Sequence, residues 1–266
     1  MRNIVILTGS KIRHLSFCKH ILDDKKIKVL KIFSQKENLM DKHLFKNKKK
    51  LISEHIKERD LFEKKFFKKY LKKKINEKMI NFHRKDYLSS KFFLNKIIKL
   101  KPDLIIVYGT SIIKGNLIKI FNKKIINIHL GLSPYYRGSG TNFFPFVNNE
   151  PEFCGVTFMF LDVGVDAGNI IHQIRPKIKF FDNFHGICNK LLSEMFDVTK
   201  LLIKNFHKIK NKRQTNVKNF RYYKTKDFND NTVKKLRKNF KDGMLKSYLL
   251  NKVYRDKRVK IINQKF

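Results

Sequence analysis

The sequence has no tryptophan, only three cysteines and five prolines, and 22 acidic residues among its 266. Cys18, Cys154 and Cys188 are odd in number and far apart, which fits neither a disulfide framework nor a metal-binding knuckle and indicates a reducing cytoplasm. No apolar run approaches the roughly 20 residues that span a membrane. The run from Ile4 to Leu7 is too short for a signal peptide and is interpreted as a strand. The sequence therefore predicts no membrane insertion.

Acidic residues are scarce compared with the 61 lysines and arginines, which give a formal net charge of +39. Such a charge attracts nucleic acids, anionic membranes and phosphorylated ligands. Only 11 of the basic residues are arginine, although the planar guanidinium is the better phosphate-binding group. Lysine, asparagine, isoleucine and phenylalanine all have A/T-rich codons. A biased genome with solvated lysines therefore explains the charge better than a dedicated nucleic-acid surface, and an anionic substrate agrees with either explanation.

Hydrophobic residues make up 42% of the chain, which is a globular composition. Residues 3–8 and 29–33 have the pattern of strands, and residues 12–22 between them have helical spacing, so the chain opens with a βαβ unit of a parallel sheet. Gly9 alone is no dinucleotide-binding fingerprint. Between 44 and 80, Phe62, Phe66, Tyr70 and Leu71 form one stripe among lysines. We interpret this stripe as the core face of a helix, and a membrane- or nucleic-acid-binding helix is the alternative.

Further elements alternate along the rest of the chain and predict an α/β fold with a mostly parallel central sheet flanked by helices. The predicted strands are 103–108, 125–129, 154–161 and 170–173, and the predicted helices are 88–100, 112–121 and 184–206. Residues 207–266 are polar, basic and weakly patterned. We predict a catalytic domain at 1–206 and a small basic extension at 207–266.

Asn127 and His129 stand two apart at the end of a predicted strand, so their side chains leave the same face. In open parallel sheets the ligand crevice lies at this end of the strands. An amide donor beside an imidazole suits a carbonyl carbon that becomes tetrahedral and develops an oxyanion. Asp166, between Gly164 and Gly168, is the candidate partner for the imidazole and for the proton of an attacking amine.

The region 126–173 resembles the core of the folate-dependent formyltransferase family, which includes methionyl-tRNA, glycinamide ribonucleotide and amino-sugar formyltransferases. The matching residues are Asn127 and His129, Ser133-Pro134, Tyr136-Arg137-Gly138, Gly155-Val156-Thr157, Asp162, Gly164, Asp166 and Gly168. Met159 departs from the pattern, because many members carry histidine there. The resemblance is most specific over 103–173 and looser before residue 100.

The resemblance implies a Rossmann-like domain that binds 10-formyltetrahydrofolate, with Asn127, His129 and Asp166 as catalytic residues. It places the pterin pocket, largely by backbone, on two segments. These are Tyr108, Gly109, Thr110, Ser111 and Ile112, and then Phe160, Leu161, Asp162, Val163, Gly164 and Val165. The implied activity is transfer of a formyl group to a primary amine.

Several acceptors agree with this activity. The short C-terminal region favours a small, anionic amine, such as a nucleotide-linked amino sugar. Methionyl-tRNA formyltransferase suits the charge, but the 60 residues after 206 are too few for the separate β-rich tRNA-binding domain of such enzymes. Hydrolysis of the formyl-folate would use the same residues, and a non-catalytic basic nucleic-acid-binding relative is a further alternative. The sequence leaves the oligomeric state open.

Overall fold

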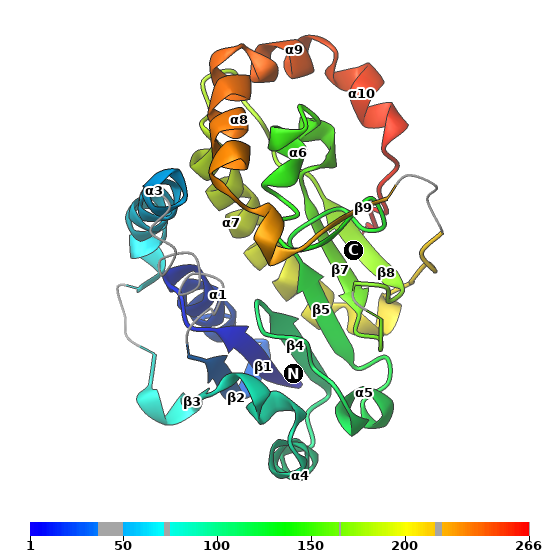
Figure 1. Ribbon diagram of the computed structural model, residues 1–266. Helices are drawn as coiled ribbons and strands as arrows, with labels where there is room; N and C mark the ends of the chain where they lie inside the picture. Colours follow the sequence, from blue (N-terminus) through cyan, green and yellow to red (C-terminus); the bar gives the residue numbers. More distant parts are fainter. Residues whose placement is uncertain (37–49, 72–74, 165, 216–219, 266) are drawn as a thin grey trace.

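The computed structural model describes residues 1–36, 50–71, 75–164, 166–215 and 220–265. Its centre is a seven-stranded sheet in which the first five strands are parallel and the last two are antiparallel to their neighbours (Figure 1). In the order in which they lie side by side, the strands are β3 (Ile80–His83), β2 (Ile27–Gln35), β1 (Arg2–Gly9), β4 (Leu104–Tyr108), β5 (Ile125–His129), β7 (Val156–Phe160) and β8 (Ile170–Ile174). The predicted α/β fold with a mostly parallel sheet is confirmed.

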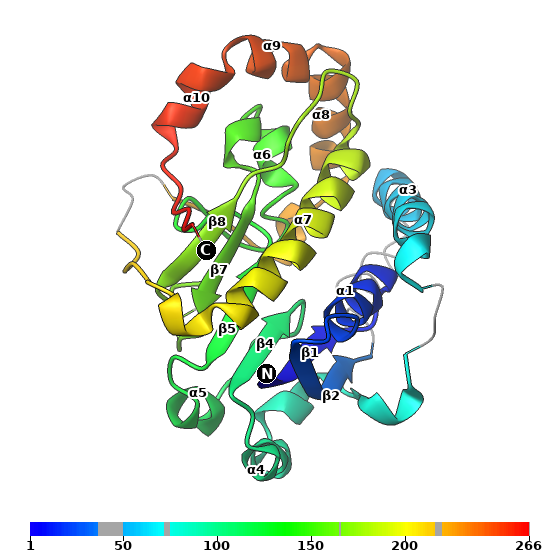
Figure 2. The same ribbon diagram turned by 180° about the vertical axis from the view of Figure 1, so that it is seen from behind.

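Helices cover both faces of the sheet. A large apolar cluster joins one face to α1 (Ile12–Leu22), α3 (Lys50–Phe67) and α7 (Phe184–Lys204), and Figure 2 shows α7 in front of the strands. A smaller cluster joins the other face to α4 (Lys91–Leu100) and α5 (Asn116–Ile120). The sheet is therefore a layer between two helical layers, as expected when both faces of parallel strands must be covered.

Alternation along β4 shows how one strand supplies both clusters. Leu104 and Ile106 belong to the large cluster, whereas Ile105 and Val107 belong to the small one. Successive side chains of a strand point to opposite faces, so a strand in the middle of this sheet must be apolar at nearly every position. The same alternation decides which face the polar side chains of β5 reach.

The aromatic stripe predicted for 62–71 is only partly correct. Phe66 and Tyr70 pack against the large cluster, but Phe62 is exposed, and the fully buried aromatic side chain is Phe67. The predicted stripe is wrong because α3 presents Ile52, His55, Ile56, Glu63 and Phe67 to the interior, and the regular helix ends at Phe67. Two of these inward residues are polar, so a hydrophobicity pattern does not reveal the buried face.

The C-terminal region contains more regular structure than its weak pattern indicated. It forms α8 (Asp230–Lys241), α9 (Met244–Leu250), α10 (Lys252–Arg258) and the short strand β9 (Arg221–Tyr223). In α8, Val233 and Leu236 are buried, and most other positions are polar or basic. So few apolar residues suffice because the helix packs on α3 and on the short helix α6 (Phe144–Val147). The strand β9 pairs in parallel with β6 (Tyr136–Gly138).

The division into residues 1–206 and 207–266 stays a prediction. The last residues of the chain return to the sheet, where the Ile262 N–H donates to Gln173 and the Gln264 N–H donates to His172. Lys212 forms a bridge with Ile170 at the start of β8. Among the described helices, none is long and apolar enough to cross a membrane.

Two buried histidines make the stability of the fold depend on pH. Burial lowers the pKa of His172 to about 4 and moves the pKa of His14 well below its ordinary value of 6.5. Each ring also accepts a backbone hydrogen bond at Nδ1, from Gln264 and Lys11 respectively. The unfolded chain therefore binds protons at these rings below about pH 6.5 while the folded chain does not, so stability falls as the pH drops from 6.5 toward 4.

We expect the urea midpoint of unfolding to decrease between pH 7 and pH 4.5. In the His172→Asn variant the midpoint should decrease less over the same pH range. Asparagine keeps an acceptor for the Gln264 N–H but does not titrate. Urea unfolding followed by circular dichroism at several pH values measures this. An equal pH dependence in the wild type and the variant would show that His172 does not contribute.

Candidate functional site

The polar residues of β5 interrupt an otherwise apolar face of the sheet. Ile126 and Ile128 point into the large cluster, and Ile125 points into the small cluster on the other face. Asn127 and His129 therefore lie on the face of the small cluster, at the carboxyl end of the strand. This confirms that the two side chains leave the same face, as the spacing predicted.

His129 lies between two acceptors. Its Nδ1 is 3.3 Å from Oδ1 of Asp166, and its Nε2 is 3.2 Å from the backbone oxygen of Tyr136. The side chain of His129 is 8% exposed and that of Asp166 is 13% exposed. A neutral imidazole donates through one nitrogen, whereas the imidazolium donates through both. Both ring nitrogens therefore face a hydrogen-bond acceptor. The structure brings together the predicted histidine and aspartate.

Asp166 is held from several directions. It has a positive φ of 50°, and the Gly138 N–H donates to its Oδ2 at 3.4 Å. The amide of Gln214 donates to the backbone oxygens of Asp166, at 2.9 Å, and of Gly168, at 2.7 Å. Arg137 in turn donates to Oε1 of Gln214 at 3.0 Å. A residue of the C-terminal region therefore fixes the loop that carries the aspartate, and no pattern in the sequence predicted this role for Gln214.

Two glycines allow the loops to approach one another around His129. A Cβ at Gly168 would collide with the backbone oxygen of Phe160, so the turn after Asp166 closes against β7 only with glycine. A Cβ at Gly131 would lie 2.7 Å from Nε2 of His129. These glycines are required by close contact rather than by flexibility.

Across the β5–β7 pair, Met159 stands opposite Asn127 and Thr157 stands opposite His129. The Thr157 hydroxyl donates to the Gly131 oxygen at 2.7 Å and accepts from the Ser133 N–H at 3.0 Å. This explains why a small polar residue lies on a buried strand. These bonds fasten the loop after β5 to β7, on the face of the sheet that also carries Asn127 and His129.

The first predicted cofactor segment follows β4. The Tyr108 side chain is buried against His14, with ring centroids 4.9 Å apart, so only its backbone can face the crevice. Gly109 has a φ of 70°, and a Cβ there would lie 2.5 Å from Nε2 of His14. The Ser111 N–H donates to Gln35, Thr110 is half-buried, and the Ile112 side chain is exposed.

The second predicted segment follows β7. The Phe160 side chain packs into the large cluster, and Leu161 packs against the small cluster that also contains Ile113. The two predicted segments therefore border the same apolar cluster, next to Asn127. Asp162, Val163 and Gly164 are exposed, and Val165 lies outside the described residues.

A charged cluster that the sequence did not single out lies at the start of α1. Arg13, which is half-buried, forms an ion pair with the buried Glu63 of α3. Burial lowers the pKa of Lys11 to about 8, assisted by the positive charges of Arg59 and Arg13. No signal in the sequence indicated this cluster, because the stripe predicted for the helix did not include Glu63.

These features define the class of the protein as a Rossmann-like α/β protein with an asparagine and an aspartate-paired histidine at the carboxyl end of a central strand. Residues 1–198 match the family described as formyl transferase. The chain belongs to the formyl transferase family.

Among sequence relatives, the chain is 39% identical over 117 residues to methionyl-tRNA formyltransferase of Desulforamulus reducens. The aligned region covers 43% of this chain and 35% of that protein. The match thus spans about a third of the relative's length. Among solved structures, the formyltransferase PseJ from Anoxybacillus kamchatkensis has a TM-score of 0.51 and 21% identity, over 88% of this chain and 97% of that one. The N-formyltransferase from Helicobacter canadensis has a TM-score of 0.56 and 18% identity, and the match covers 89% of this chain and 80% of that one. These structures share the fold.

Proposed function

We propose that the protein transfers a formyl group from 10-formyltetrahydrofolate to a primary amine, with Asn127, His129 and Asp166 as the catalytic residues. The observation that carries this proposal is the His129–Asp166 pair beside Asn127, at the carboxyl end of β5. It agrees with family membership, and two similar structures contain tetrahydrofolate or folinic acid.

The residues around the crevice fit a reduced folate. The small apolar cluster supplies a hydrophobic wall, and the exposed side chains of Ile112 and Val163 are apolar. Residues 108–112 and 160–164 follow the ends of β4 and β7 at this edge of the sheet, and Gly109 and Gly164 let their turns pack closely against His14 and Ala167. The folate supplies an activated formyl group, and the chain supplies the groups that orient it and move protons.

Each catalytic side chain has a distinct task in this proposal. When the amine attacks the formyl carbon, the carbonyl oxygen becomes an oxyanion, which the Asn127 amide and the His129 imidazolium stabilise. Asp166 holds Nδ1 of the ring in its protonated form and orients the ring. The attacking amine loses a proton, which passes toward Asp166 and leaves on the departing folate nitrogen. The closed loop around Gly168 and Gln214 keeps Asp166 in place during these steps.

We expect Asn127→Ala to lower kcat about 10²- to 10³-fold, because one oxyanion donor is typically worth about 2.7–4 kcal/mol. The affinity for the folate should change little, since the donor acts on the developing charge. Single-turnover transfer of radiolabelled formyl measures kcat, and Met159→Leu, on the paired strand, is the matched control. An Asn127→Ala variant with unchanged turnover would remove Asn127 from the mechanism.

For the acceptor, we propose a nucleotide-linked amino sugar. A cavity of about 700 Å³ lies on the far side of Tyr136, the residue whose backbone oxygen faces His129. Its walls combine arginines with aromatic rings and amides, the groups that bind phosphates and nucleobases. They include Arg221, Arg255, Arg258, Tyr135, Tyr254 and Asn251. Similar structures contain UDP-4,6-dideoxy-4-formamido-L-AltNAc or dTDP-3-aminofucose.

A tRNA acceptor is the second candidate. The matched sequence relatives are methionyl-tRNA formyltransferases, and the chain carries a net charge of +39. However, the match to the Desulforamulus reducens protein covers 43% of this chain, and the described residues after 206 form three α-helices and one three-residue strand. These observations support the smaller acceptor.

We expect formyl transfer to a UDP- or dTDP-linked amino sugar and none to initiator methionyl-tRNA. Arg258→Ala should raise KM for the nucleotide sugar about tenfold or more at little cost in kcat, since a charged hydrogen bond is worth roughly 1.5–3 kcal/mol. Lys257→Ala, an exposed neighbour outside the cavity wall, is the control. Transfer to tRNA that weakens steeply with salt would overturn the acceptor assignment, and release of formate without an amine would indicate hydrolysis.

A further inference from the structure

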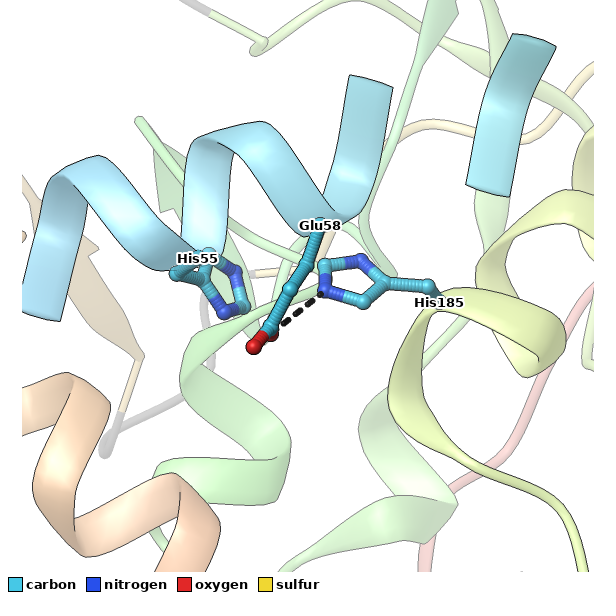
Figure 3. A group of neighbouring side chains, drawn as sticks. All are labelled: His55, Glu58 and His185. Atoms are coloured by element: carbon cyan, nitrogen blue, oxygen red, sulfur yellow. Dashed lines mark ion pairs between the residues drawn. The ribbon is translucent and has the colours of Figure 1, made fainter. Parts of the chain in front are cut away.

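Three metal-ligating side chains meet away from the catalytic residues. His55 and Glu58 lie one turn apart on α3, and His185 lies at the start of α7. One candidate ligand atom from each residue lies within 4.8 Å of the other two. Figure 3 shows the carboxylate of Glu58 between the two imidazole rings, whose centroids are 4.7 Å apart. The catalytic set of Asn127, His129 and Asp166 shares no residue with this group.

The two histidine side chains lie largely inside the protein. His55 is 6% exposed and His185 is 7% exposed. His55 packs against Phe143, Phe184 and Phe228, and its ring forms no hydrogen bond within the described part of the chain. His185 faces the carboxylate of Glu58. The rings are thus held by packing, and the His55 nitrogens are not engaged by another described group.

The histidines offer the kind of atom that coordinates a metal. Each imidazole has a ring nitrogen whose lone pair can bind a cation, and histidine is the commonest metal ligand in proteins. One such nitrogen of each ring lies within 4.8 Å of the other and of a Glu58 carboxylate oxygen.

The carboxylate is oriented by a residue from a third helix. Arg237 of α8 donates to Oε1 of Glu58 at 3.0 Å, while Oε2 lies 3.7 Å from Nε2 of His185. A hydrogen-bonded carboxylate with its second oxygen directed at the metal is a common arrangement around metal ligands. The guanidinium charges near the site are themselves paired. Arg237 also contacts Glu54, and Arg59 contacts Asp60.

We propose that His55, Glu58 and His185 bind one divalent transition-metal cation of the Zn²⁺ type, with a fourth position left for water. Two imidazoles and one carboxylate favour zinc, cobalt or nickel over magnesium and calcium, which take oxygen ligands. Ligand atoms around zinc lie about 3.3 Å apart for bonds of roughly 2.0 Å, so the group must contract by about 1.5 Å. Rotation of Glu58, whose side chain is half exposed, can supply much of this movement.

The bound ion would tie α3 to α7 and, through Arg237, to α8. These helices enclose Phe143, which contacts His55 and directly precedes α6. The metal would therefore stabilise the helical layer of the protein. The proposal does not depend on the reaction assigned to the crevice.

Titration of the chelator-treated full chain with Zn²⁺ and with Co²⁺ tests the proposal. We expect one saturable site per chain by calorimetry, a rise in Tm with Zn²⁺, and the intense visible absorption of four-coordinate Co²⁺. His185→Asn and Glu58→Gln should each weaken binding at least about tenfold. His207→Asn, at an exposed histidine outside the group, should bind like the wild type.

His185 is buried, so weak binding by its variant counts only where the variant is folded. Glu58→Gln, at an exposed residue of α3, keeps the test decisive. Absence of saturable binding to the folded wild-type chain overturns the proposal. Equal binding by the wild type and Glu58→Gln also overturns it, because the metal would then sit elsewhere.

Discussion

The pairing of His129 with Asp166 is the interaction on which the arrangement of the site depends. It joins the end of a parallel strand, β5, to a loop that leaves an antiparallel one, β7. To bring the two side chains within 3.3 Å, the chain must reverse direction after β7 and place Asp166 at a positive φ. Much of the surrounding structure serves this closure, including the tight turn at Gly168 and the amide of Gln214.

The closure also gives the C-terminal region a place in the site. Gln214 fixes the aspartate loop, β9 pairs with β6 beside Gly138, and Arg221 lines the cavity behind Tyr136. Tyr136 of β6 links the His129–Asp166 pair to the candidate acceptor cavity. Its backbone oxygen faces His129, and the same residue lines the cavity.

The sequence predicted the sheet and singled out Asn127 and His129 as candidate residues because both have strong local signals. Buried strands such as β4 are apolar at every position, and Asn127 and His129 stand out as polar residues at the end of such a strand. It did not predict Gln214 or the His55–Glu58–His185 group, since these depend on contacts between distant segments that leave no periodic pattern. The buried face of α3 was misread for a related reason, because it includes His55 and Glu63.

The net charge of the chain has no single structural counterpart. Many lysines lie exposed along α3, α8 and α10, whereas the arginines more often take part in defined contacts, as Arg13, Arg137 and Arg237 do. This distribution agrees with lysine as a solvating residue and arginine as a structural one. It leaves the crevice, rather than the surface charge, as the feature that identifies the activity.

Calorimetric titration with 5-formyltetrahydrofolate, a stable analogue of the donor, tests the central claim most directly. We expect saturable binding to one site per chain. In NMR spectra of the same titration, the amide chemical shifts of Ser111, Ile112 and Val163 should change. No saturable binding at millimolar ligand by a folded chain would contradict it, and so would saturable binding that leaves those amides unchanged.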